Sequence, residues 1–94
     1  MNERALRLIV RGKVQGVGFR WFVRETARRC ELRGWVRNNA NGSVELAAAG
    51  DPDCVDRLLA AVRRGPQGAR VDEVREESLD GDAGSLPSPF AVQK

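Results

Sequence analysis

The residues best suited to chemistry lie in one short stretch, Gly12 to Arg20, which holds glycines at positions 12, 16 and 18. Glycine allows neighbouring backbone N–H groups to turn toward one point, where an anion can bind. The guanidinium of Arg20 offers a planar fork of donors that fits a phosphate or carboxylate in bidentate fashion. The stretch therefore predicts an oxyanion site, and in particular a phosphate site.

The segments on either side place this stretch between a strand and a helix. Leu6, Leu8 and Val10 alternate along the chain, which predicts a strand over about residues 5–11. Apolar residues recur at helical spacing from Phe19 to Cys30, and the start of that helix would add unpaired N–H groups and a positive dipole end. The alternative is a tight strand-to-helix turn with a surface arginine. The stretch is neither a Walker A loop nor a dinucleotide fingerprint, because no Gly-Lys-Ser/Thr follows and Trp21 replaces the third glycine.

The rest of the chain alternates between strand and helix patterns. Strands are expected at residues 34–38, 43–50 and 70–77, a helix from Asp51-Pro52 to the Gly65-Pro66 stop, a loop over 79–89, and a short closing strand at Phe90-Ala91-Val92. The turn over residues 39–42 contains Asn41-Gly42, which suits positive φ. Val71 and Val74 sit three apart rather than two, so a β-bulge is expected in that pairing.

The element order β-α-β-β-α-β predicts an α+β fold, a ferredoxin-like sandwich with two helices on one face of an antiparallel sheet. Right-handed crossovers and a tight hairpin give the strand order 4-1-3-2. The first and second strands then run parallel and end at the same edge, with one strand between them. The loop that ends at Arg20 is therefore expected to meet Asn38, the last residue of the second strand.

Two motifs of the chain resemble the signatures of the acylphosphatase family. The segment from Val10 to Arg20 resembles that family's phosphate loop, and a second motif comprises Gly34-Trp35-Val36-Arg37-Asn38, Gly42, Val44 and Gly50. Neither motif departs from the family pattern. The resemblance covers essentially the whole chain, so residues 1–94 are expected to form a single domain.

The resemblance implies an enzyme, an acylphosphatase that hydrolyses the carboxyl–phosphate bond of acyl phosphates without a metal or other cofactor. It implies that Arg20 holds the phosphate and that Asn38 orients the attacking water. The substrate-binding residues expected from the family pattern are Gln15, Gly16, Val17, Gly18, Phe19 and Arg20. No general base of the usual kind occurs in the motifs, so the substrate must carry a good leaving group, as an acyl phosphate does.

The sequence alone leaves the roles of several side chains open. Asn38 either orients water or only ends its strand ahead of the Asn-rich turn. Trp21 is either a wall of the pocket or packing for the neighbouring loop. Gln15 needs to contribute no more than its backbone, and Arg37 is expected to point to solvent.

Histidine is absent, which excludes Ser-His and Cys-His nucleophilic schemes, phosphohistidine chemistry and histidine metal sites. The two cysteines, Cys30 and Cys54, cannot form a zinc site alone. We expect two buried thiols, with a disulfide as the alternative because the fold places both residues on one side of the molecule.

Charge is distributed unevenly along the chain. Residues 1–44 hold ten Lys/Arg and three Asp/Glu, a net charge of +7. Residues 45–94 hold six Lys/Arg and ten Asp/Glu, a net charge of −4. The basic half contains both motifs, so it should attract small anions. With 5% aromatic residues and no Tyr, the chain has little for base stacking, and no nucleic-acid partner is expected.

No apolar run approaches a membrane span, and the N-terminus does not resemble a signal peptide. A cytoplasmic monomer with small-molecule ligands, acyl phosphate and inorganic phosphate, is therefore expected. Two other classes compete with the enzyme: a non-catalytic binding module of the same fold, and a domain of a larger protein such as a carbamoyl-transferring hydrogenase maturation factor. The intact Arg20 and Asn38 favour the enzyme.

Overall fold

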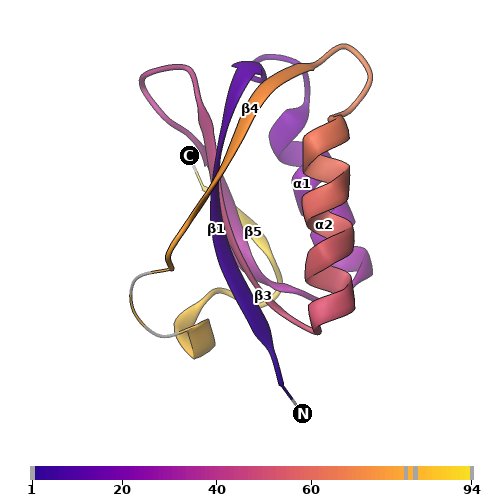
Figure 1. Cartoon of the computed structure of the whole chain (residues 1–94), viewed down its shortest axis with the longest axis vertical. Coiled ribbons are helices and arrows are strands. Elements are labelled where there is room, and N and C mark those ends of the chain that lie inside the picture. The colour runs from indigo at the N-terminus through magenta and orange to yellow at the C-terminus, as the bar shows by residue number, and fades with distance from the viewer. Residues whose placement is uncertain (1, 80, 82, 94) are drawn as a thin grey trace.

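Two helices cover one face of a five-stranded sheet in the computed structural model, which describes residues 2–79, 81 and 83–93 (Figure 1). The elements in chain order are β1 (Arg4–Lys13), α1 (Phe19–Arg29), β2 (Arg33–Asn38), β3 (Val44–Gly50), α2 (Pro52–Arg64), β4 (Arg70–Glu77), the 3₁₀ turn η1 (Ala83–Ser85) and β5 (Ala91–Val92). The predicted order of elements is confirmed, including the short closing strand. Neither helix is long and apolar enough, within these residues, to cross a membrane.

The strand order is β4-β1-β3-β2-β5, and its first four strands pair antiparallel in the predicted order. The expectation of a purely antiparallel sheet is wrong, because β5 pairs parallel with β2 and makes the sheet mixed. The Gly34 N–H donates to the Pro87 carbonyl and the Gln93 N–H donates to the Val36 carbonyl, at 2.8 Å each. These bonds attach the returning chain to the edge of β2.

The core lies between the sheet and the helices. On β1, alternate residues are buried, whereas every residue of the central strand β3 is buried. The largest fully buried side chains are Phe19, Phe90, Leu6, Leu8, Leu32, Leu46, Leu58, Val10, Val14, Val23, Val36 and Val44. Phe19 and Val14 belong to this core, so both ends of the β1–α1 loop are anchored by burial.

The pairing of β1 with β4 shifts register between Arg11 and Gly12. Val74 therefore lies opposite Val10 while Val71 lies opposite Gly12, and both valines pack against the core. The predicted bulge is confirmed. It lets two valines three residues apart face the same side of the sheet.

The start of α2 differs in one detail from the expectation. Pro52 occupies the first turn as predicted, but Asp51 at the N-cap position makes no side-chain capping hydrogen bond. Its carbonyl instead accepts from the Val55 N–H at 3.0 Å. The end of α2 follows the prediction, with Gly65 as the C-cap and its N–H donating to the Ala61 carbonyl.

The β1–α1 loop, residues 14–18, and the β2–β3 turn lie at the same end of the molecule (Figure 1). The 3₁₀ turn η1 lies on the opposite face of the sheet from the helices (Figure 1). The fold thus brings Asn38, at the end of β2, to the same end as the glycine loop.

Candidate active site

The β1–α1 loop turns through two left-handed glycines, Gly16 at φ +76° and Gly18 at φ +74°. A Cβ at either position would meet no atom within 4 Å, so backbone conformation rather than crowding requires glycine there. Gly18 is the N-cap of α1 and provides no capping side chain. Among the described residues, no protein acceptor is assigned to the N–H groups of Gly16, Val17 or Gly18, so these donors are available to an anion.

Arg20 lies in the first turn of α1 and is partly buried. Its Nη1 donates to the carbonyl oxygen of Gln93, just after β5, at 3.3 Å. No ion pair is assigned to it within the described part of the chain. The carbonyl therefore fixes the direction of the guanidinium, while Nη2 and Nε remain for a bidentate ligand.

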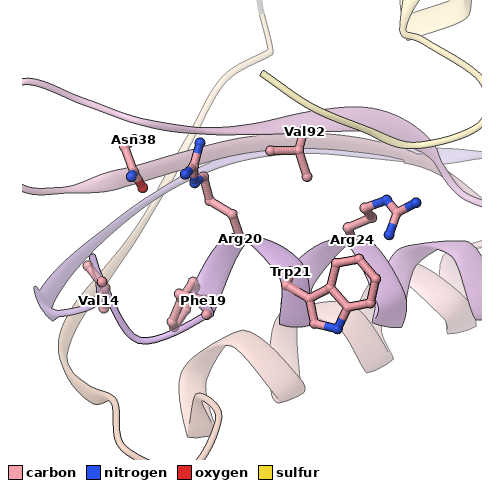
Figure 2. A pocket seen from close by; sticks show the side chains of 9 residues that line it. Val14, Phe19, Arg20, Trp21, Arg24, Asn38 and Val92 are labelled. Carbon is pink, nitrogen blue, oxygen red and sulfur yellow. The ribbon is translucent and has the colours of Figure 1, made fainter. Parts of the chain in front are cut away.

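Asn38 is the last residue of β2 and lies opposite Val44 of β3. Its side chain is exposed, and Figure 2 shows its amide on the same side of the sheet as Arg20. Side-chain bonds in the following turn come from its neighbours: Asn41 Oδ1 accepts from the Ser43 N–H, and Asn39 Nδ2 donates to the Ser43 hydroxyl. Within the described residues, none of the assigned hydrogen bonds of this turn involves the Asn38 amide.

One cavity of about 440 Å³ brings these parts together (Figure 2). Its lining residues are Val14, Gly16, Gly18, Phe19, Arg20, Trp21, Arg24, Asn38 and Val92. None of the nine is acidic, and two are arginines one helical turn apart. A small anion that enters the cavity therefore meets positive charge and backbone donors without carboxylate repulsion.

Two of the expected substrate-binding residues do not line the cavity. Val17 packs against the core cluster, and Gln15 directs its side chain elsewhere. Gln15 Nε2 donates to the carbonyl oxygens of Asn39 and Ser43, each at 2.9 Å. The Gln15 amide thus ties the glycine loop to the β2–β3 turn, and a contribution of Gln15 to ligand binding through its backbone alone stays a prediction.

Four lining residues, Val14, Trp21, Arg24 and Val92, were not assigned to the site from the sequence. Trp21, which had two interpretations, is a wall of the cavity and carries the Arg24 guanidinium 4.6 Å from its ring centroid. Arg24 follows Arg20 by four residues, and this helical spacing was a usable signal. Val92 arrives through the parallel pairing of β5 with β2, for which the sequence held no signal beyond a short apolar run.

Arg37 reaches solvent as expected, with 44% of its side chain exposed, but two neighbours also hold it. Its guanidinium lies 4.8 Å from the ring centroid of Trp35, and Nη2 donates to Glu45 at 3.1 Å. Glu45 is buried, and Arg7 and Asn39 also donate to it. Burial raises the pKa of Glu45, but the hydrogen bonds from Arg7, Arg37 and Asn39 outweigh it and hold that pKa below its ordinary value.

Cys30 and Cys54 are free thiols, in agreement with the expectation of two thiols rather than a disulfide. They are partly exposed, however, and not buried as expected. The hydrogen bond with Cys30 raises the pKa of Cys54 to about 11, and burial acts in the same direction. Within the described ranges, no group of three or more His, Cys, Asp or Glu side chains is arranged to hold a metal ion.

Comparison with known proteins assigns the chain to a family. The family model described as acylphosphatase matches residues 6–91. The chain belongs to the acylphosphatase family. The acylphosphatase of Nitratidesulfovibrio vulgaris strain DP4 is 45% identical over 82 residues, which are 87% of this chain and 82% of the relative.

Solved structures agree with this membership. An acylphosphatase from Coxiella burnetii superposes with a TM-score of 0.87 at 39% identity, covering 98% of this chain and 94% of that one. Full-length HypF, solved in a phosphate- and nucleotide-bound form, matches with a TM-score of 0.81 at 26% identity over 99% of this chain and 12% of that one. The acylphosphatase fold thus occurs both as a small protein and as a part of a much larger one.

Proposed function

We propose that this chain is an acylphosphatase that hydrolyses the carboxyl–phosphate bond of acyl phosphates to a carboxylate and inorganic phosphate, without a metal ion or a phosphoenzyme. One observation carries the proposal: Arg20, the glycine-loop N–H groups and Asn38 line a single cavity that contains no acidic residue. Family membership over residues 6–91 supports the same reaction.

In the proposed mechanism the loop and Arg20 bind the phosphoryl oxygens. The Gly16–Gly18 N–H groups and the two remaining donor positions of Arg20 stabilise negative charge there. These donors are fixed before the substrate arrives, because the Gln93 carbonyl orients Arg20 and burial of Val14 and Phe19 anchors the loop. The chain therefore supplies position and charge stabilisation rather than a nucleophile.

Asn38 is proposed to hold the attacking water. The water oxygen bonds to phosphorus while the bond from phosphorus to the acyl oxygen breaks, and that electron pair leaves on the carboxylate. A phosphate oxygen takes the proton of the water, so no protein base is required. The absence of Asn38 from the hydrogen bonds that organise the turn supports this role over that of a strand terminator.

The proposal extends to the setting of the reaction. We propose that the 94 residues act as one catalytic domain, as a cytoplasmic monomer, on small acyl phosphates rather than nucleic acid. A cavity of about 440 Å³ suits a ligand of that size, and the 5% aromatic content offers little for base stacking. Light scattering of the purified protein tests the monomer.

The deciding experiment measures hydrolysis of benzoyl phosphate by protein treated exhaustively with EDTA, with phosphate monoesters as control. We expect full turnover of benzoyl phosphate, little of the monoesters, and competitive inhibition by inorganic phosphate at constant ionic strength. Activity that depends on a restored divalent ion would contradict the metal-free mechanism. Absence of turnover together with phosphate binding would favour the non-catalytic binding module.

A further inference from the structure

The cavity contains both of the large hydrophobic side chains that are exposed among the described residues. Trp21 is 61% exposed and Val92 is 37% exposed. They come from α1 and β5, elements far apart in sequence, yet both line the cavity that holds Arg20. Single exposed apolar residues are ordinary, but their concentration at one polar site points to a ligand with an apolar part.

The geometry of phosphoryl transfer predicts which part of the substrate lies there. The attacking oxygen and the leaving oxygen lie on opposite sides of phosphorus, roughly in line. Figure 2 shows Asn38 on one side of Arg20, and Trp21 and Val92 on the other. If water arrives from the Asn38 side of a phosphate held by Arg20, the acyl group extends toward Trp21 and Val92.

The exposed Trp21 ring has a stacking partner. Arg24, one turn further along α1, places its guanidinium 4.6 Å from the ring centroid and is itself paired with Glu25 at 3.0 Å. This stacking favours the observed orientation of the ring. A flat indole and a branched aliphatic side chain together offer a surface suited to a planar apolar group.

We propose that Trp21 and Val92 form an acyl-group subsite that selects acyl phosphates with a planar, apolar acyl group over those with a small one. This inference rests on the proposed acylphosphatase function and adds the part of the substrate that the phosphate loop does not recognise. Because the acyl contact exists before and during the reaction, it lowers KM more than it raises kcat.

The test compares benzoyl phosphate with acetyl phosphate in the wild type and in Trp21→Ala. We expect kcat/KM for benzoyl phosphate to fall about tenfold, mainly through KM, and that for acetyl phosphate to fall no more than about twofold. Inhibition by inorganic phosphate should stay at the wild-type level, because phosphate does not reach the subsite. Val92→Ala should lower the benzoyl-to-acetyl ratio by about threefold.

Trp35 provides a matched control, because it also carries an arginine over its ring, with Arg37 at 4.8 Å, but does not line this cavity. Trp35→Ala should leave the benzoyl-to-acetyl ratio unchanged on folded protein. The subsite would be contradicted, and the proposed function would stand, if Trp21→Ala lost equal activity toward both substrates. An unchanged benzoyl-to-acetyl ratio in both Trp21→Ala and Val92→Ala would have the same meaning. A wild type that hydrolyses neither acyl phosphate would overturn the proposed function, and the subsite with it.

Discussion

Each side of the sheet carries a tryptophan with an arginine stacked on it, but the arginines serve different ends. On the helix side, Arg24 covers Trp21 at a cavity that also holds Arg20 and has no acidic lining residue. On the opposite side, Arg37 covers Trp35 and donates to the buried carboxylate of Glu45. The same pair of residue types therefore occurs in two electrostatic settings.

Arg24 and Arg37 both have a carboxylate partner, so the difference in charge lies in Arg20, the other arginine of the cavity. Glu45 is 7% exposed and accepts from Arg7 at 2.8 Å, from Arg37 at 3.1 Å and from Asn39 at 3.2 Å. Arg20 has only a carbonyl oxygen as its assigned partner in the described structure. The opposite face uses its cations to stabilise the fold, whereas the cavity keeps a cation for an incoming anion. The following changes test that contrast, from the largest expected effect to the smallest.

Arg20→Lys should have the largest effect, because lysine keeps the charge but loses the planar fork. We expect kcat/KM for benzoyl phosphate to fall by about 100-fold to 1,000-fold, with an unchanged thermal midpoint. Arg37→Lys on the opposite face is the control and should retain near-normal turnover. Steady-state kinetics on both variants checks this, and comparable turnover in the two would remove the contrast between the faces.

Asn38→Ala should reduce kcat by about 10-fold to 100-fold, because the water loses its orientation while the phosphate ligands stay in place. Inhibition by inorganic phosphate, measured alongside, should change little. Asn39→Ala is the matched control, since Asn39 donates to Ser43 and Glu45 rather than lining the cavity. A large loss of phosphate inhibition in Asn38→Ala would instead place Asn38 among the phosphate ligands.

Glu45→Gln should alter stability rather than catalysis. Removing the carboxylate leaves Arg7 and Arg37 without their shared partner, and we expect a loss of about 2 kcal/mol in the free energy of unfolding. Urea titration measures the loss, and kcat per folded molecule should be unchanged. A large fall in kcat at wild-type stability would show that the opposite face participates in the reaction.

Glu45 also predicts the direction in which the stability of the fold changes with pH. Because the folded-state pKa of Glu45 lies below its ordinary value of 4.5, its contribution is fully present above that value. The contribution is lost as the pH falls through the lower folded-state pKa. Glu45→Gln should therefore be less stable than the wild type at pH 7, and the two should converge in strong acid.

Cys54→Ser should have the smallest effect, because Cys54 lies in the first turn of α2 and does not line the cavity. Turnover should stay within about twofold of wild type. The hydrogen bond with Cys30 raises the pKa of Cys54 to about 11, so alkylation should be slow at pH 7.5 and should accelerate only well above that. Rapid alkylation at neutral pH would contradict the hydrogen-bonded thiol pair.

Local patterns in the sequence were sufficient to predict most of the fold. Alternation over Leu6, Leu8 and Val10 predicted β1, and the spacing of Val71 and Val74 predicted the bulge opposite β1. The handedness of crossovers then predicted the order of four strands. The parallel strand β5 changed the sheet from antiparallel to mixed, because two residues carry no pattern that indicates a direction.

The relative placement of the glycine loop and Asn38 depends on the backbone and was predictable, whereas side-chain directions that depend on distant partners were not. Topology alone predicted that the glycine loop and Asn38 would meet, and both line one cavity. The direction of the Gln15 amide depends on the carbonyls of Asn39 and Ser43, and that of Arg20 on the Gln93 carbonyl. Such contacts between segments 24 to 73 residues apart leave no periodic signal in the sequence.

The two hydrogen bonds of Gln15 have a consequence for the thermodynamics of ligand binding. A loop with two left-handed glycines is costly to order, because glycine loses more conformational entropy than any other residue. Gln15 fastens that loop to the β2–β3 turn through two carbonyls at 2.9 Å, so the ordering is completed when the chain folds. In the proposed function, phosphate would meet donors that are already in position, and its binding free energy would not be reduced by the cost of arranging them.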